Sequence, residues 1–428
     1  MSANNLPKST VFSCFLAGCL EMYDFAIFGF LSALLHKNYL SFLSGSGGMI
    51  ITYALFAVGF FFRPLGSLIF GYIGDVYGRK PALVLSVTLM GTASLGMCLL
   101  PSYQATGISA CYIMALIRAI QGISVGGEYN GAVLYAIEHT NKNIGLVGSI
   151  VTAGGTLGVL IATFVSKIVQ SPGMPEYSWR LAFLLGFGLS IVGYVIRKKL
   201  KETPIFNKRN SNQKGIPLIQ GFKFLKAEFV AAFFISAASN TNFYFLLVFF
   251  PNYLKSINSI DTSNVCLMVT LLILVLVPIF GYLSDRLSRV TMLIIGFLSI
   301  GLYNIVFLDL VSSAPSLIGI MAYTIISAII VAMTVGVVSV FVVEIFLAQY
   351  RFSNTALSYS LGVAIFGDTV PMVAAWIIER FGNVPSYIGI YVACVSLLGA
   401  MGGLIIVNKQ KTILKSQSRI TSGFKEVN

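Results

Sequence analysis

Charged residues are scarce in this chain: Asp, Glu, Lys and Arg make up only 10% of its 428 residues, whereas a soluble domain carries about 25%. Hydrophobic residues make up 57% of the chain. They form uninterrupted runs of roughly 20 residues, and a helix of that length crosses about 30 Å of hydrocarbon. The runs lack the alternation of apolar and polar residues that is typical of membrane β-barrel strands. The composition therefore predicts a polytopic α-helical membrane protein.

Histidine and cysteine are also scarce, which argues against metal chemistry. The chain has two histidines, His36 and His139, and six cysteines, which are scattered and form no Cys-x-x-Cys pair. Such spacing favours neither a metal site nor a disulfide framework. The sequence also lacks a phosphate-binding glycine loop and an organised set of Ser, His and Asp. We therefore expect no enzymatic activity, no metal and no cofactor.

Acidic residues are outnumbered by basic ones, and the net charge is +13 at pH 7. Most of the Lys and Arg residues lie at alternate boundaries of the apolar runs, in one long central loop and near the C-terminus. Loops rich in Lys and Arg mark the cytoplasmic side of a membrane protein. The charge distribution therefore predicts that both termini are cytoplasmic, and it argues against a nucleic-acid partner.

Twelve apolar runs follow one another along the chain, and one long polar stretch separates the sixth from the seventh. The runs cover about 11–35, 49–73, 81–100, 108–137, 145–168, 180–197, 228–250, 264–283, 291–311, 316–343, 354–378 and 386–407. We therefore predict an N-terminal six-helix bundle (1–198), a cytoplasmic linker (199–226), a C-terminal six-helix bundle (227–408) and a basic cytoplasmic tail (409–428).

A short polar motif occurs twice, once in each half of the chain. Residues 71–79 read GYIGDVYGR and residues 281–289 read GYLSDRLSR, an offset of 210 residues. Each copy joins two apolar runs, so the halves are predicted to be related bundles. Two related bundles that meet at the middle of a membrane are a common plan for an alternating-access carrier.

The charged residues of the two motifs are expected to form a gate at the cytoplasmic surface. Each motif supplies an acid and a base, and one further acid follows a later apolar run in each half. The predicted gate residues are Asp75, Arg79, Glu138, Asp285, Arg289 and Glu344. A single surface ion pair contributes only about 0–1 kcal/mol. A network that forms in one state of a carrier can still bias a nearly balanced equilibrium.

Six ionisable residues lie inside the apolar runs, where a charge costs at least roughly 2.5–3.5 kcal/mol. They are Glu21, Asp24, Arg63, Arg118, Glu128 and Asp368. The set contains four acids and two bases, so two carboxylates lack a basic partner within it. Such carboxylates are expected to exchange protons near neutral pH. We predict proton coupling at Asp24 and Glu128, with Glu21 in support; a purely structural charge network is the alternative.

Polar residues on the same helices as these charges are candidate substrate ligands. Gln121 and Glu128 are seven positions apart and share one helix face, and Arg118 borders that face. A packing or neutralising role is the alternative for both arginines. Aromatic rings on the same helices are suited to holding a cationic group. The predicted substrate-binding residues are Arg63, Arg118, Gln121, Asn242, Tyr244, Tyr359 and Asp368.

The repeated motif resembles the signature that the major facilitator superfamily carries in its 2–3 and 8–9 loops. Further segments are similar to the metabolite:proton symporter branch of that family, which includes proline/betaine, α-ketoglutarate, citrate and shikimate permeases. They are residues 21–25 (EMYDF), 63–66 (RPLG), 118–129 (RAIQGISVGGEY), 179–180 (WR), 183–186 (FLLG), 202–204 (ETP) and 366–371 (FGDTVP). Three positions depart from the usual pattern: Ser288 and Asp368 replace residues that are commonly glycine, and Leu347 replaces a proline.

The resemblance implies two six-helix halves, a multi-pass location in a bacterial inner membrane, and proton-driven uptake of a small polar metabolite. The predicted substrate is a zwitterionic osmolyte or amino acid such as proline or betaine. The alternatives are an organic-acid symporter, a uniporter or exporter of the same fold, and a transporter-like sensor. The expected partners are a small-molecule substrate, protons and the lipid bilayer, and we expect a monomer.

Overall fold

The structure is a computed structural model that describes residues 8–40, 46–140, 142–207, 217–251, 253–254, 263–313, 316–382 and 384–423. Every regular element within these ranges is a helix. Twelve of the described helical segments are long and apolar enough to cross a membrane, which confirms the predicted all-helical class with twelve spans. The middle of the predicted linker, 208–216, and the last residues of the predicted tail, 424–428, lie outside the described residues.

The described part of the first six spans and the linker contains ten helices. They are α1 (Lys8–Phe30), α2 (Ser32–Tyr39), α3 (Ser46–Val76), α4 (Arg79–Cys98), α5 (Tyr103–Thr106), α6 (Ser109–Glu138), α7 (Ile144–Val169), α8 (Trp179–Lys198), α9 (Pro204–Asn207) and α10 (Pro217–Phe224). The last six spans contain α11 (Lys226–Tyr244), η1 (Phe245–Phe249), α13 (Ser263–Ser284), α14 (Arg289–Ser313), α15 (Leu317–Glu344), α16 (Arg351–Gly362), η2 (Val363–Gly367), α17 (Val370–Phe381) and α18 (Pro385–Gly423).

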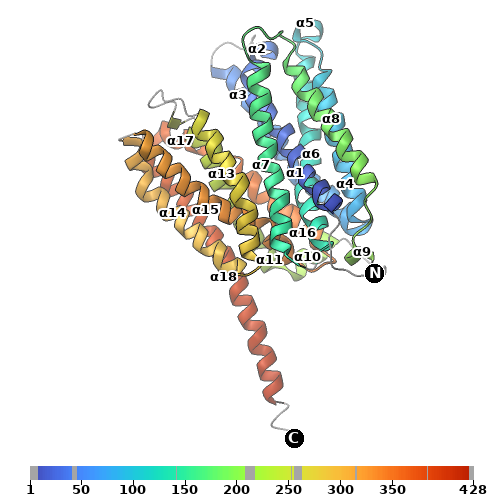
Figure 1. The fold of residues 1–428 in the computed structure, drawn as a ribbon, viewed down its shortest axis with the longest axis vertical. Coiled ribbons are helices and arrows are strands. Elements are labelled where there is room, and N and C mark those ends of the chain that lie inside the picture. Colours follow the sequence, from blue (N-terminus) through green and yellow to red (C-terminus); the bar gives the residue numbers. More distant parts are fainter. Residues whose placement is uncertain are drawn as a thin grey trace.

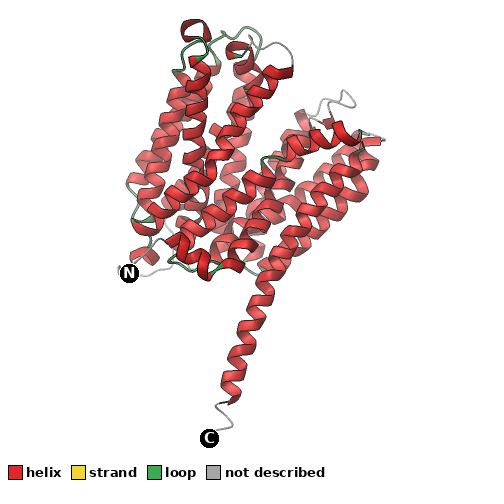
Figure 2. Ribbon diagram, turned by 180° about the vertical axis from the view of Figure 1, so that it is seen from behind, coloured by secondary structure: helices red, strands yellow, loops and turns green. Residues whose placement is uncertain are grey.

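The helices form two groups, one built from α1 to α8 and the other from α11 to α18 (Figure 1). The loops of the repeated motif follow α3 and α13 and lie at the end of the molecule that also holds α10, which is termed the hinge end. The two groups approach each other at the hinge end. They diverge toward the opposite end, where α2, α5 and α17 lie, as the view from behind also shows (Figure 2).

Glycines let helices of the first group pack closely on one another. Gly122 and Gly126 of α6 lie against the α3 backbone, and Gly154 and Gly158 of α7 lie against the α1 backbone. Small residues allow such close approach in a membrane, where no hydrophobic force drives helices together. The sequence leaves open whether these patterns serve static packing or sliding. Their partners belong to the same group, which favours static packing.

Gly126→Ala is expected to destabilise the protein by about 1–3 kcal/mol through overpacking. The new methyl group would lie 2.2 Å from the Arg63 carbonyl oxygen, and backbone atoms cannot turn aside as a side chain can. Gly188→Ala is the matched control, since no neighbouring atom of the described residues lies within 4 Å of that position. The melting temperature in detergent should fall for Gly126→Ala alone. Equal melting temperatures for the two variants would contradict this account of the α3–α6 contact.

Two antiparallel helix pairs, α3 with α16 and α7 with α13, join the two groups. Along the first pair, Gly71 lies against Ser353, and one turn further from the hinge end the Ser67 hydroxyl is 2.6 Å from the Ser360 hydroxyl. Along the second pair, Gly281 of α13 lies against α7. Small side chains thus bring backbones of different groups together near the hinge end.

Two spans contain a π-helical turn that the sequence does not predict. The apolar runs 228–250 and 354–378 predict single helices, whereas the structure places η1 after α11 and η2 between α16 and α17. Such wide turns are rare and occur frequently at functional sites. The turn in η2 is followed directly by Asp368, and the turn in η1 is preceded directly by Tyr244, two of the predicted substrate ligands.

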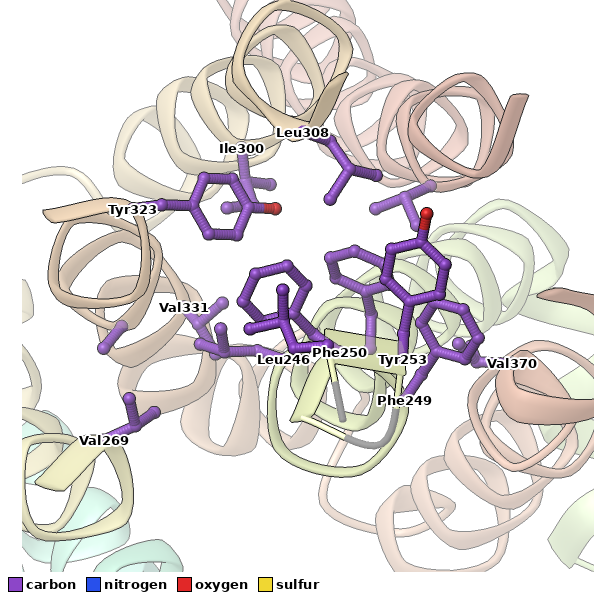
Figure 3. Packing of buried hydrophobic residues seen from close by; sticks show 14 of the residues in the cluster. Leu246, Phe249, Phe250, Tyr253, Val269, Ile300, Leu308, Tyr323, Val331 and Val370 are labelled. Carbon is purple, nitrogen blue, oxygen red and sulfur yellow. The ribbon is translucent and has the colours of Figure 1, made fainter. Parts of the chain in front are cut away.

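One of the hydrophobic clusters of the second group contains residues of η1, α13, α14 and α15 (Figure 3). Phe250 packs on Tyr323 with ring centroids 4.8 Å apart, and Phe249 stacks on Tyr253 at 5.5 Å. The Tyr323 hydroxyl donates a hydrogen bond to the Asn304 side chain in α14. This hydrogen bond matters because an unpaired hydroxyl inside the core would destabilise it. The aromatic core therefore joins the end of η1 to α14 and α15.

The last helix is longer than the final apolar run. The sequence predicts a membrane helix over 386–407 and a basic tail from Lys409, and the structure continues α18 as a helix to Gly423. The part that is apolar enough to cross a membrane ends at Lys411. The remaining turns project away from both groups at the hinge end (Figure 1).

Candidate functional site

Asp75 joins the two groups by capping a helix of the other group. One of its carboxylate oxygens accepts a hydrogen bond from the backbone N–H of Phe352 (3.2 Å), and the second accepts bonds from the N–H and hydroxyl of Ser353 (2.9 and 2.7 Å). Both residues lie in the first turn of α16, where backbone N–H groups lack partners within the helix. A carboxylate is favoured there because the helix dipole is positive at this end.

Asp285 makes the equivalent contact in the opposite direction. Its two carboxylate oxygens accept hydrogen bonds from the N–H groups of Gly145 (2.7 Å) and Leu146 (3.0 Å), in the first turn of α7. The repeated motif therefore places an aspartate of each group on a helix N-terminus of the other group. Two related contacts of this kind hold the hinge end together.

Arg79 organises a buried charge network around Asp75. Its guanidinium lies 3.1 Å from an oxygen of Asp75 and donates two hydrogen bonds of 3.2 Å to Glu138. Glu138 also accepts a 2.6 Å hydrogen bond from the Thr203 hydroxyl and lies 3.8 Å from Arg351 of the second group. The side chains of Arg79, Asp75 and Glu138 are at most 1% exposed. The prediction of a surface network is wrong for this half, because the groups close over it.

Arg289 forms the corresponding network in the second half. Its nitrogens lie 2.7 Å from Asp285 and 2.7 Å from Glu344. Here the Arg289 and Glu344 side chains are 21% and 30% exposed, so this network is partly solvated, as predicted for both. Exposed pairs contribute little to stability because water screens them. The charge networks of the two halves therefore join equivalent residues, but the first network is buried and the second is partly exposed.

The two motifs also start their next helix differently. In the first, Glu202 accepts hydrogen bonds from the N–H groups of Arg79 and Lys80 at 3.0 Å each. This contact requires Gly78, whose φ is 122° and whose missing side chain leaves space for Glu202. In the second, Ser288 stands in place of the glycine, and its own hydroxyl accepts from Thr291 N–H at 3.4 Å. The departure at Ser288 thus exchanges one helix cap for another.

Inside the membrane spans, the structure buries all six predicted charges. The exposed fraction is 3% or less for each of Glu21, Asp24, Arg63, Arg118, Glu128, with Asp368 at 2% for its side chain. The structure also buries Arg197 of α8, which is 2% exposed and which the sequence does not single out. Sequence reasoning missed it because a basic residue at the end of an apolar run is typical of topology signals.

Of the four acids predicted inside the spans, Glu21 and Asp24 form no ion pair among the described residues, whereas Glu128 and Asp368 each pair with an arginine. Neither oxygen of Asp24 has a hydrogen-bond partner of good geometry, and the same is true of one oxygen of Glu21. Ser94 and Arg118 are polar neighbours of Asp24. Gly186 of α8 leaves the space for this carboxylate, since a methyl group there would lie 2.2 Å from its oxygen. The acids stand three residues apart on α1, on one helix face.

Glu128, in contrast, is fully bonded. Arg197 of α8 donates a 2.5 Å hydrogen bond to one of its oxygens, and the Ser86 hydroxyl of α4 donates to the other. Arg197 donates a second hydrogen bond to the backbone carbonyl of Leu83 at 2.9 Å. The pair therefore joins α4, α6 and α8 within the first group.

Arg197→Met is expected to destabilise the protein by about 3–5 kcal/mol, because it leaves Glu128 charged and buried without a cation. Replacing both members of a buried ion pair by neutral residues is often close to neutral. Arg197→Met with Glu128→Gln should therefore recover most of the loss in melting temperature. If the double variant melts as low as the single variant, the ion pair is not the reason for the loss.

Arg118 lies among aromatic rings. Its guanidinium carbon is 4.2 Å from the Phe28 ring centroid and 4.7 Å from that of Phe25, and it donates a 2.8 Å hydrogen bond to Gln121. Arg63 lies over the same Phe25 ring at 4.4 Å. Cation–π contacts of this kind partly replace the solvation of a buried guanidinium. The structure thus brings together three of the predicted substrate ligands, Arg63, Arg118 and Gln121.

The predicted ligands of the second group lie in different surroundings. Tyr244 faces Asp368, and the Asp368 carboxylate lies 3.8 Å from Arg63. Tyr359 contacts the Asn240 side chain at 3.4 Å and packs against Tyr129 of the first group, with ring centroids 5.4 Å apart.

Asn242 turns away from these residues. Its side-chain nitrogen donates to the Ser396 hydroxyl in α18 at 3.0 Å and to a carbonyl of its own helix. Sequence reasoning missed Tyr129, Ser94 and Asn240 as members of the site, although Tyr129 directly follows Glu128 and Asn240 lies two positions before Asn242.

Comparison with known proteins gives consistent results. The family model of the Major Facilitator Superfamily matches residues 14–362. The chain is 29% identical over 442 residues to the proline/betaine transporter of Salmonella typhimurium, covering 98% of this chain and 87% of that protein. It is 28% identical over 422 residues to a putative proline/betaine transporter of Staphylococcus aureus, covering 92% and 86%.

Solved structures show the same fold at low sequence identity. A proton:xylose symporter, XylE, bound to 6-bromo-6-deoxy-D-glucose matches with a TM-score of 0.74 and 17% identity, covering 92% of this chain and 94% of that one. The human organic anion transporter MFSD10 matches with a TM-score of 0.70 and 15% identity, covering 93% and 100%. At these identities the similarity bears on the fold alone.

Proposed function

Since this transporter chain belongs to the major facilitator superfamily, we propose that it takes up a small zwitterionic metabolite together with protons across a bacterial inner membrane. The names of its relatives support a zwitterion such as proline or betaine as the solute. Its basic loops support cytoplasmic termini by the positive-inside rule. The hinge end is then the cytoplasmic end.

The observation that carries proton coupling is the pair of acids without cations on α1. A carboxylate that is shielded from water and forms no ion pair is stabilised in its protonated form. When the carrier is open to one side of the membrane, the acid would take up a proton from water on that side. When the carrier then closes to that side and opens to the other, the acid would release the proton there. Asp24 is the proposed proton carrier, because neither of its oxygens forms an ion pair or a hydrogen bond of good geometry among the described residues, and Glu21 lies one turn away on the same face. Glu128 is assigned to holding helices together, because Arg197 neutralises it.

The contacts between the groups support alternating access. The aspartate caps at Asp75 and Asp285 close the cytoplasmic end in this structure, and both must break when that end opens. The α3–α16 contact continues from Asp75 to Arg63, twelve residues away, which is about 18 Å along a helix. Arg63 therefore lies near the middle of a hydrocarbon layer of about 30 Å. The charges at that depth are the proposed solute site.

Uptake into proteoliposomes tests the proposal. Vesicles containing the purified protein, with an alkaline interior and an acidic exterior, should accumulate radiolabelled glycine betaine or proline above the external concentration. Collapsing the pH difference should reduce uptake to equilibration. Equilibration at the same rate with and without the gradient would indicate a uniporter. Saturable binding without uptake would indicate a sensor and would contradict the proposal.

A further inference from the structure

Arg63 and Asp368 form an ion pair that bridges the two groups of helices inside the membrane. Arg63 lies on α3, and Asp368 directly follows the π-helical turn η2. The two side chains are only 4% and 2% exposed. The pair continues the α3–α16 contact beyond Ser67 and Ser360, away from the hinge end. At this position the contact between the two groups is therefore electrostatic, and close packing of small residues does not contribute to it.

The Arg63–Asp368 ion pair forms few hydrogen bonds that would compensate for the loss of water inside the membrane. The shortest distance between a guanidinium nitrogen and a carboxylate oxygen is 3.8 Å, which is too long for a hydrogen bond. The Nε and Nη2 atoms of Arg63 and both oxygens of Asp368 have no hydrogen-bond partner of good geometry among the described residues. Buried charges are stabilised only when hydrogen bonds accompany the Coulomb attraction. Four buried polar atoms thus lack a well-formed hydrogen bond, with Tyr244 as a polar neighbour of Asp368, and a ligand can supply the missing partners.

The surroundings suit a ligand that carries both signs of charge. Phe25 and Phe60 lie 4.4 and 5.2 Å from the Arg63 guanidinium, and Tyr244 faces Asp368. A carboxylate binds a guanidinium through two parallel hydrogen bonds, and a quaternary ammonium is held by aromatic faces beside a carboxylate. The two kinds of partner that the solute needs are thus present side by side, one in each group of helices.

We propose that the Arg63–Asp368 ion pair is the recognition site for the zwitterion, whose carboxylate binds Arg63 and whose cationic group binds Asp368. This inference rests on the proposed function and assigns its solute site. The solute takes the place of each residue's present partner, so both buried charges remain paired. It then bridges α3 and the α16–α17 span, which belong to different groups, and their separation is coupled to its binding.

The same geometry disfavours ions with a single charge. A monocarboxylate on Arg63 would leave Asp368 buried and unpaired, and a simple cation on Asp368 would leave Arg63 unpaired. An unpaired buried charge is strongly unfavourable, whereas a zwitterion leaves none. The ion pair therefore discriminates between zwitterions and organic acids, two solute classes that the sequence alone does not rank strongly. Asp368 is the residue that makes the difference, since it stands where a glycine is common in the family branch that the sequence resembles.

The test compares glycine betaine with 3,3-dimethylbutyrate, in which a neutral carbon replaces the quaternary nitrogen and the shape is retained. Dissociation constants are measured with the purified protein by calorimetry, and choline serves as the ligand without a carboxylate. Wild-type protein should bind glycine betaine at least about tenfold more tightly than either of the other ligands, equivalent to about 1.4 kcal/mol. Equal binding of betaine and 3,3-dimethylbutyrate by wild type would overturn the proposal without any variant.

Asp368→Asn should then weaken betaine binding at least about tenfold and leave 3,3-dimethylbutyrate binding unchanged or stronger, because the anion no longer competes with a carboxylate for Arg63. Asp309→Asn, which removes another acid of the second group, should leave the ratio of the two constants at the wild-type value. A general structural loss in Asp368→Asn would lower both affinities together, and that result would overturn the proposal. Asp368→Glu should keep the wild-type preference for betaine.

The outcomes separate this inference from the proposed function. If the wild type binds neither betaine nor proline, the proposed solute class and the inference both fall. If the wild type binds and accumulates betaine while Asp368→Asn keeps the wild-type ratio of constants, the transport function stands and the inference alone falls.

Discussion

Asp24→Asn should abolish the accumulation of solute that a pH gradient drives, while exchange of labelled for unlabelled solute continues. A carrier that moves one proton with each solute can hold about a tenfold concentration ratio per pH unit, since a tenfold ratio corresponds to about 1.4 kcal/mol. The amide of Asn cannot release a proton, so the ratio should fall to one. Exchange needs no net proton movement and should persist. Both quantities are measured in the same proteoliposomes, with the membrane potential collapsed.

Two comparisons define which acid carries the proton. Glu21→Gln removes the second carboxylate that has no ion pair. If it abolishes accumulation while Asp24→Asn retains it, the roles of the two acids are reversed. The double variant Arg197→Met with Glu128→Gln removes the paired acid and its partner together. It should keep gradient-driven accumulation, because Glu128 is proposed to have a structural role. Loss of accumulation in a stably folded double variant would indicate that Glu128 takes part in proton coupling.

Asp75→Asn should loosen the cytoplasmic closure by about 3 kcal/mol, which is roughly a hundredfold in the equilibrium between closed and open states. The carboxylate accepts three hydrogen bonds from Phe352 and Ser353 and also pairs with Arg79. Asn provides one acceptor oxygen and no charge, and its NH2 group would face a backbone N–H. Backbone amide exchange in the first turn of α16 should therefore become at least tenfold faster, and the rate of uptake should fall.

Asp285→Asn is the matched control in the other half. It should speed exchange more in the first turn of α7, where Gly145 and Leu146 donate to Asp285, than in the first turn of α16, which is exposed only through opening of the hinge end. Its effect should also be smaller, because Arg289 and Glu344 of this network are partly exposed and water can replace the lost contact. Equal acceleration of both turns in either variant would contradict the view that each aspartate caps one helix.

The sequence predicts the class and the span count because long apolar runs have few physical alternatives in a membrane. It also predicts from charge counting alone that two buried acids lack a cation, and the structure identifies them as Glu21 and Asp24. The pairing behind that number differs from the simple count, because Arg197 pairs with Glu128, whereas Arg118 lies among aromatic rings and donates to Gln121. The count cannot say which acids remain, since that depends on Arg197, a residue whose position at a helix end looks like a topology signal.

Other features depend on contacts between distant parts of the chain. The partners of Asp75 and Asp285 are backbone N–H groups, which carry no sequence signal, so the sequence predicts salt bridges and misses the helix caps. The burial of Arg79 and Glu138 is missed for a similar reason: helix ends are usually solvated, and only the approach of the second group covers them. Asn242 is polar within an apolar run and therefore predicted as a ligand, although its amide is bonded to Ser396.

The proposed transport cycle requires that one solute molecule and one proton cross the membrane together. The most direct measurement follows the external pH of lightly buffered proteoliposomes, without any imposed gradient, when glycine betaine is added outside. The account predicts that the medium becomes alkaline as betaine enters, with about one proton taken up per betaine, and that Asp24→Asn shows no such change. Entry of betaine into wild-type vesicles at constant external pH would contradict it.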